Sequence, residues 1–136
     1  MRKFILLSLF LIGGNFLFAQ KVPYNVVFDV TTSDTIVHRM VTRWVSEIIN
    51  ADPSANVEVV FYAKSLGMIT SGSTVSDSIA KFTAMKNVKF KVCEVAMKNN
   101  KVEKSQLLPQ IQTVPDGIYE IISKQEDGWG YIKAAH

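Results

Sequence analysis

The chain has 136 residues, with 15 lysine and arginine side chains against 12 aspartate and glutamate side chains, and a formal net charge of +3. Arg2 and Lys3 lie in the amino-terminal segment described next, so the rest of the chain is close to neutral. It lacks the surplus of positive charge typical of nucleic-acid-binding proteins. The single cysteine excludes a disulfide bond within one chain.

The amino-terminal segment predicts a secretory signal peptide. The basic start M-R-K is followed by an apolar run over 4–12, a break at G-G-N over 13–15, and L-F-A at 17–19 with the small residue Ala19 before polar Gln20. The run is too short to span a bilayer comfortably, and it has no polar face of the kind an amphipathic anchor presents. We therefore expect cleavage after Ala19, so that 1–19 is the signal peptide. We also expect export to the periplasm or out of the cell, with no stable membrane anchor in the mature protein.

The residues after Ala19 begin with a strand pattern and a long helix pattern. Residues 24–30 are rich in β-branched and aromatic side chains, which predicts a strand. The spacing of apolar residues then predicts a helix to about Asn50, with Thr32 or Ser33 as N-cap and Asp34 in the first turn.

A second strand and a second helix follow. The apolar run 57–62 predicts a strand of a sheet that is covered on both faces, and the glycine-bearing stretch 63–73 predicts a loop. The pair Thr74 and Asp77 resembles a capping box and predicts the start of a helix. That helix has one apolar stripe, made of Val75, Ile79, Phe82 and Met85.

The second half continues the alternation. Alternating apolar and lysine residues over 88–92 predict a strand that ends near Cys93, and helix-forming residues follow it. We expect a helical turn over 103–108 and a short strand over 111–114. The segment P-D-G at 115–117 introduces a last helix with Ile118, Ile121 and Ile122 on one face, and 129–133 predicts a final strand.

Strands alternating with helices over short connections predict an α/β fold, a three-layer α/β/α sandwich with a mainly parallel sheet in a flavodoxin-like topology. We expect 20–136 to form a single domain. One feature disagrees with a sheet covered on both faces. Lys89 and Lys91 lie on the same side of their strand, where a covered sheet would carry apolar side chains. Either that side is only partly covered, or the lysine stems are buried with their ammonium groups reaching solvent.

The only cysteine, Cys93, lies where a strand pattern changes to a helix pattern. The unpaired N–H groups at a helix start favour a thiolate there. The surrounding segment 81–104 holds seven lysines against two glutamates, which favours the thiolate as well. We name Lys91 and Lys98 as the thiolate-stabilising lysines. The alternative is that Cys93 is a small buried hydrophobic residue.

The residues around Cys93 resemble the cysteine segment of the DsrE/DsrF-like family. The resemblance is carried by V-C-E-V-A-M-K-N-N-K-V at 92–102, by V-P-D-G at 114–117 and by Q-E-D-G-W-G-Y-I at 125–132. It covers the chain after the signal peptide, and in the first half it matches only the order of elements. The signal peptide departs from the family, because the sulfur-relay members work in the cytoplasm.

The resemblance implies a DsrE-like sandwich that assembles into homotrimers or homohexamers. It also implies that Cys93 matches the cysteine that carries persulfide sulfur in the relay members, as a sulfur carrier or sulfurtransferase. We therefore expect a thiol-bearing donor or acceptor protein as partner and no cofactor. The competing hypothesis is a non-catalytic oligomeric binding or structural protein in which Cys93 is packed inside.

Other constellations are weaker. The stretch T-T-S-D-T at 31–35 resembles a phosphate loop but lacks the glycine that such a loop needs, so helix capping is favoured. Neither His38 nor His136 has a partner at metal-ligand spacing, so no metal site is expected. A Cys93–His38 nucleophile–base pair stays open. Asp29 ends a strand at the same sheet edge, where capping or solvent exposure is favoured over an orienting role.

Overall fold

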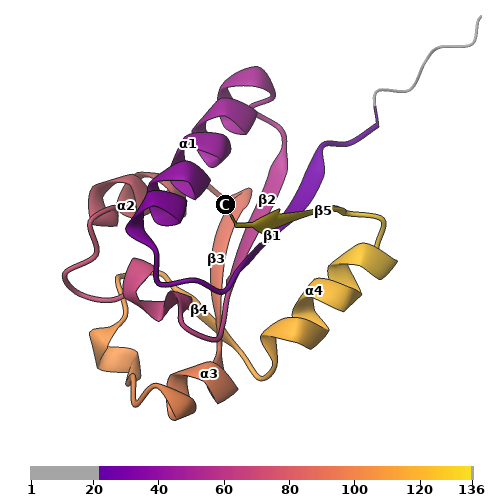
Figure 1. The fold of residues 1–136 in the computed structure, drawn as a ribbon. Coiled ribbons are helices and arrows are strands. Elements are labelled where there is room, and N and C mark those ends of the chain that lie inside the picture. Colours follow the sequence, from indigo (N-terminus) through magenta and orange to yellow (C-terminus); the bar gives the residue numbers. More distant parts are fainter. Residues whose placement is uncertain (1–21, 136) are drawn as a thin grey trace, which may run out of the picture.

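Five parallel strands form one sheet in the order β4-β3-β2-β1-β5. The computed structural model describes residues 22–135 (Figure 1). The strands are β1 (Asn25–Val30), β2 (Asn56–Phe61), β3 (Val88–Cys93), β4 (Gln112–Val114) and β5 (Gly130–Ala134). The helices are α1 (Thr35–Ala51), α2 (Ser76–Thr83), α3 (Glu94–Asn99) and α4 (Gly117–Glu126), with short 3₁₀ helices η1 (Ser65–Met68) and η2 (Lys104–Gln106). The predicted signal peptide, its cleavage point and His136 lie outside the described residues.

The strand order explains which helices cover which face. From β1 to β4 the chain moves across the sheet in one direction, and right-handed crossovers put α1 and α2 on the same face. From β4 to β5 it returns to the opposite edge, so α4 lies on the other face (Figure 1). The predicted α/β sandwich with a parallel sheet is confirmed, while the strand order differs from the 2-1-3-4-5 order of flavodoxin.

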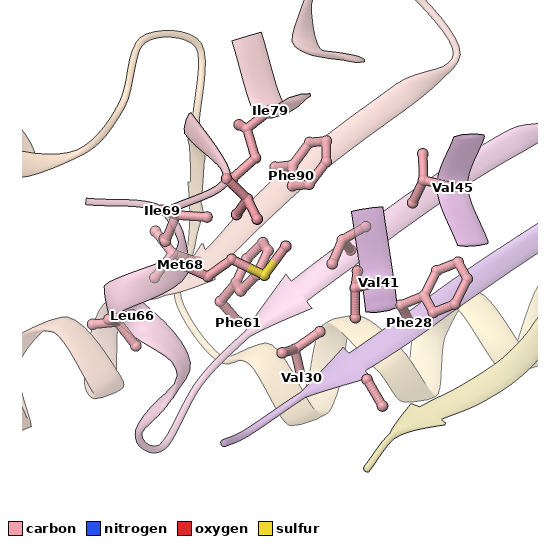
Figure 2. Packing of buried hydrophobic residues seen from close by; sticks show 14 of the residues in the cluster. Phe28, Val30, Val41, Val45, Phe61, Leu66, Met68, Ile69, Ile79 and Phe90 are labelled. Atoms are coloured by element: carbon pink, nitrogen blue, oxygen red, sulfur yellow. The ribbon is translucent and has the colours of Figure 1, made fainter. Parts of the chain in front are cut away.

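The main hydrophobic core lies between the sheet and α1, α2 and η1. Figure 2 shows Phe28 and Val30 of β1 and Phe61 of β2 packed with Val41 and with Met68. The rings of Phe61 and Phe90 stack with their centroids 6.0 Å apart. This face holds nearly all the large buried side chains, so it supplies most of the hydrophobic stabilisation of the fold.

The face under α4 is different, because one helix covers it. Its small apolar cluster consists of Val27, Val60 and Ile121. Polar side chains also point to this face, among them Lys89 and Lys91. Lys89 is exposed and Lys91 is mostly buried, so the predicted partial cover of this side of β3 is confirmed.

Two predicted helix starts are wrong in detail. The N-cap of α1 is Asp34, whose Oδ1 accepts a hydrogen bond from the Ile36 amide at 2.7 Å, whereas Thr32 Oγ1 accepts from the Asp34 amide. Aspartate and serine are about equally good caps, so residue preference at this stretch does not decide between Ser33 and Asp34. The predicted capping box at Thr74 does not form, because α2 begins at Ser76 with no side-chain cap.

The stretch predicted as a loop at 63–73 contains η1, whose residues Leu66 and Met68 reach the core. The predicted turn at 103–108 is confirmed as η2, where Glu103 and Gln106 cap each other reciprocally. The three isoleucines of α4 that we expect on one helix face differ in burial. Ile121 is buried, but Ile118 and Ile122 are 55% and 46% exposed, because the small face under α4 has room for one row of apolar side chains.

Within 22–135, every helix is too short or too polar to cross a membrane.

Candidate functional site

Cys93 is the last residue of β3 and the N-cap residue of α3, as the sequence predicts. Its backbone is extended, with φ −69° and ψ 123°, and its side chain is 5% exposed. In a strand, residues two positions apart point to the same face, so Cys93 lies on the α4 side together with Lys91. The carboxyl edge of a parallel sheet is where ligand sites form in α/β folds.

A cavity of about 380 Å³ opens at Cys93. Its walls come from three segments that are far apart in the sequence, namely the loop after β2, the helix α3 and the start of α4. The lining residues are Tyr62, Ala63, Lys64, Cys93, Val95, Ala96, Asn99, Asn100, Asp116 and Ile118. The thiol is thus mostly buried but lies next to a space of the size that small molecules occupy.

The start of α4 packs directly on Cys93. A Cβ placed on Gly117 would lie 3.1 Å from Cys93 Cβ, 3.2 Å from Val60 Cγ1 and 3.6 Å from Tyr62 Cβ. Before it, Asp116 Oδ1 accepts hydrogen bonds from the Ile118 and Tyr119 amides at 2.8 and 3.2 Å and caps the helix. A side chain at 117 would therefore force Cys93, Val60 or α4 to shift by a few tenths of an ångström.

The wall after β2 is fixed by hydrogen bonds. Ala63 has a left-handed backbone with φ 53°, which is uncommon for a residue with a Cβ. Its carbonyl accepts a hydrogen bond from Asn100 Nδ2 at 2.7 Å, and the same amide nitrogen donates to the Ala96 carbonyl at 2.8 Å. Asn100 therefore connects the β2 loop to the end of α3 across the cavity.

The two lysines named from the sequence do not line this cavity. Lys91 Nζ lies 2.6 Å from Glu120 Oε1 and 2.9 Å from Glu58 Oε2, so it connects β3 to α4 and β2. Lys98 is exposed in the last turn of α3. The lysine that does line the cavity is Lys64. The sequence offered no signal for it beyond its place just after a strand.

Glu58, Lys91 and Glu120 form a coupled charge cluster under α4. Burial raises the pKa of Glu58, and its hydrogen bond with Glu120 raises it further. Burial alone would raise the pKa of Glu120 too, but hydrogen bonds with Glu58 and Lys91 lower it overall. The Lys91 pKa is raised because its two carboxylate partners outweigh the effect of burial. Glu58 Oε1 is buried and has no hydrogen-bond partner among the described residues.

Asp29 is buried at the carboxyl end of β1 and has its own partners. Its Oδ2 accepts a hydrogen bond from the Tyr131 hydroxyl at 2.7 Å, and its Oδ1 accepts from Lys133 Nζ at 2.9 Å. The hydrogen bond to Asp29 raises the pKa of Tyr131 to about 12. Burial and the nearby Asp29 charge raise the pKa of Tyr62, whose ring lies 5.6 Å from Lys133 Nζ. Asp29 is thus buried and holds the side chains of Tyr131 and Lys133 of β5, so the favoured expectation of capping or solvent exposure is wrong.

The remaining predicted candidates lie elsewhere. His38 Nε2 donates to the Thr32 carbonyl at 2.8 Å, so its ring fixes the start of α1, and it does not line the cavity of Cys93. In 31–35, Asp34 caps α1, Thr32 Oγ1 accepts from the Asp34 amide and Thr31 Oγ1 accepts from Lys133 Nζ, so helix capping by Asp34 is confirmed. No group of three or more histidine, cysteine, aspartate or glutamate side chains within 22–135 could hold a metal ion.

A sequence model of the DsrE/DsrF-like family matches residues 26–134. The chain belongs to the DsrE/DsrF-like family. Membership in the DsrE/DsrF-like family suggests a function related to sulfur relay. The match spans all five strands, and it includes both Cys93 and the V-P-D-G segment that starts α4.

Solved structures share the DsrE-like fold at low sequence identity. A protein of unknown function from Methanobacterium thermoautotrophicum is 24% identical, with a TM-score of 0.76 over 81% of this chain and 98% of that chain. The ychN protein from E. coli is 9% identical, with a TM-score of 0.69 over 82% of this chain and 99% of its own. A conserved protein of unknown function from Bacteroides thetaiotaomicron is 14% identical, with a TM-score of 0.67 over 81% of this chain and 94% of that chain. A search of curated proteins finds no significant match.

Proposed function

We propose that this protein carries sulfane sulfur as a persulfide on Cys93, as a sulfur carrier or sulfurtransferase. The observation that carries the proposal is the placement of the one thiol in a DsrE-family chain. Cys93 ends a strand, lies against the first residue of α4 and lines a cavity at the carboxyl edge of the sheet.

The chemistry needs a thiolate and no other reactant than donor and acceptor. The Cys93 thiolate attacks the outer sulfur of a persulfide R–S–SH, a new S–S bond forms, and R–S⁻ leaves with the electron pair of the broken bond. Cys93 then holds S–SH. An acceptor thiolate attacks that outer sulfur in the same way and regenerates the Cys93 thiolate, so no external oxidant or reductant is consumed.

Lys91 and Lys98, the lysines named from the sequence, are expected to differ in how far they stabilise the thiolate. Lys98 lies in the same short helix as Cys93 and stays a candidate for stabilising the thiolate at longer range. Lys91 is bound to two carboxylates, so its charge is largely compensated where it stands. We therefore expect Lys91 to stabilise the Cys93 thiolate less than its position two residues before Cys93 suggests.

Mass analysis of the intact protein tests the proposal. After exposure to polysulfide, the native protein should gain one sulfur atom that a reducing agent removes. Cys93→Ser should gain none while keeping its circular dichroism spectrum. If native Cys93 reacts with thiol reagents only in denaturant, and if Cys93→Ser unfolds the protein, the sulfur-carrier proposal fails.

The second candidate is a non-catalytic oligomeric binding protein. It is favoured by the low exposure of Cys93, at 5%, and by the exposed apolar side chains of Ile118, Tyr119 and Ile122 on α4. The same thiol titration separates the two candidates, since a packed cysteine and a carrier cysteine differ in rate by orders of magnitude in the native state.

Export stays a prediction, because 1–19 lies outside the described residues. In a cell with two membranes, the mature protein should begin at Gln20 and be recovered from the periplasm. Amino-terminal sequencing of the purified native protein checks this, and recovery of Met1 from a soluble cytoplasmic fraction would contradict it.

A further inference from the structure

The lysines on the α4 side of the sheet differ in whether their charge is compensated. Lys91, Lys124 and Lys133 each lie within 4 Å of a carboxylate, at 2.6, 3.7 and 2.9 Å from their partners. Lys64, the lysine that lines the Cys93 cavity, has no carboxylate partner among the described residues. An uncompensated ammonium group beside a reactive thiol is available to a ligand.

The backbone that carries Lys64 is fixed on both sides. The Lys64 amide donates to the Thr31 carbonyl at 3.0 Å, and the preceding Ala63 carbonyl is held by Asn100. The following residue, Ser65, is fully buried and donates from Oγ to the Tyr62 carbonyl at 2.8 Å. The position of Lys64 is therefore set by the fold, and only its side chain needs to adjust to a ligand.

The other cavity walls are mainly apolar. Val95, Ala96 and Ile118 supply hydrocarbon surface. Asp116 is the one acidic residue in the lining, and its Oδ1 is bound by the first amides of α4, which partly balance its charge. A volume of about 380 Å³ falls in the range of small-molecule sites, which run from about 300 to 1,000 Å³.

We infer that the Cys93 cavity takes a small organic sulfur compound with a carboxylate or sulfonate group, and that Lys64 recognises this negative charge. The inference rests on the proposed function, since it names the substrate class of the same thiol. The apolar walls hold the organic part of the donor persulfide and the Lys64 ammonium binds its anionic group, so that the outer sulfur meets the Cys93 thiolate. The leaving R–S⁻ keeps the anionic group and departs as a dianion or higher anion.

Two aromatic disulfides, one negatively charged and one uncharged, test this inference. Dithiobis(nitrobenzoate) is a dianion and dithiodipyridine is uncharged; with either, the Cys93 thiolate forms a mixed disulfide and releases one aryl thiolate or thione that is measured by absorbance. Rates on the native protein are divided by rates on the denatured protein, which removes the intrinsic difference between the reagents.

At low ionic strength, Lys64→Gln should slow the reaction of the dianionic reagent about fivefold and leave that of the uncharged reagent unchanged. A fivefold change in rate corresponds to losing the attraction between two unit charges about 4 Å apart in water. Added salt should reduce the wild-type preference. Lys64→Arg should keep the preference. The matched control is Lys86→Gln, which makes the same change of net charge at an exposed turn before β3, on the opposite edge of the sheet, and should alter neither rate.

The outcomes separate the two proposals. If neither reagent modifies native wild-type protein, the proposed function of Cys93 fails. If both reagents react but Lys64→Gln leaves their ratio as it was, or Lys86→Gln changes it equally, the inference about Lys64 is overturned and the sulfur-carrier proposal stands. Lys64→Met serves as a second neutral variant if circular dichroism shows that Lys64→Gln does not fold.

Discussion

Gly117 and Cys93 are separated by the whole of β4 and its connections, yet they are in direct contact through the start of α4. A Cβ on Gly117 would lie 3.1 Å from the Cβ of Cys93, closer than side-chain carbons normally approach. The position of α4 on the sheet therefore depends on the absence of a side chain at 117, and the surroundings of the thiol depend on the position of α4.

Gly117→Val should destabilise the protein by about 1–3 kcal/mol, because overpacking forces α4 or Cys93 to shift. Gly117→Ala should cost less, since the higher helix propensity of alanine offsets part of the strain by up to about 1 kcal/mol. Denaturant unfolding measures both. The control is Gly67→Ala in η1, where a Cβ would meet nothing within 4 Å. A Gly117→Val variant with wild-type stability and wild-type thiol reactivity would show that the contact has no consequence.

Lys91→Met should destabilise the fold by about 3 kcal/mol or more, because it leaves Glu58 buried without its nearest cation. Lys91→Met combined with Glu58→Met should recover much of the loss, since an apolar replacement of a buried ion pair is often neutral. Lys89→Met is the matched control, because Lys89 is exposed two residues earlier on the same strand.

The same variants test the role of Lys91 toward the thiol. If Lys91 acts mainly on its carboxylates, alkylation of Cys93 in the folded double variant should proceed at the wild-type rate. A severalfold slower reaction in that variant, with Lys89→Met unaffected, would instead support Lys91 as a thiolate-stabilising residue.

The dependence of stability on pH should change in opposite directions when Glu58 and Glu120 are neutralised. The pKa of Glu58 in the folded state is raised above the ordinary 4.5. Between these two pKa values the folded state binds more protons than the unfolded state, so this group favours folding at low pH. Glu120 has a lowered pKa, so its contribution is present above 4.5 and is lost as the pH falls through its folded-state value.

Glu58→Gln should therefore make the free energy of unfolding rise more steeply with pH above 4.5. Glu120→Gln should make it rise less steeply with pH below 4.5. Urea unfolding at a series of pH values measures both slopes. Equal changes of slope in the two variants would contradict the opposite pKa shifts within the cluster.

The family resemblance implies a homotrimer or homohexamer with closed symmetry, and the exposed apolar side chains of α4 offer a surface for this assembly. Ile122→Glu or Tyr119→Glu should lower the mass measured by light scattering, because a buried unpaired charge opposes association. Ile36→Glu is the control, since Ile36 is similarly exposed on α1, on the other face of the sheet. A wild-type protein that is monomeric at micromolar concentration would contradict the prediction.

Local patterns in the sequence determined the elements of this fold and the place of its thiol. Period-two and helical spacings act within a few residues, so they identified every strand and α-helix, though not η1, and put Cys93 where β3 meets α3. They were least reliable where neighbouring residues compete for one role, as Thr32, Ser33 and Asp34 do at the cap of α1.

The tertiary structure decided what surrounds the thiol, because those contacts join residues that are distant in the chain. Lys91 and Glu120 are 29 residues apart and Asp29 and Tyr131 are 102 apart. Glu58, within the apolar run V-E-V-V-F, was the one local signal of a buried carboxylate that needs a cation partner. This signal does not identify which lysine is the partner. The return of the chain from β4 to β5 leaves α4 alone on its face, and that placement brings Gly117 onto Cys93 and leaves Ile118 and Ile122 exposed. No local pattern encodes such a choice, because it follows from the handedness of a crossover over the whole sheet.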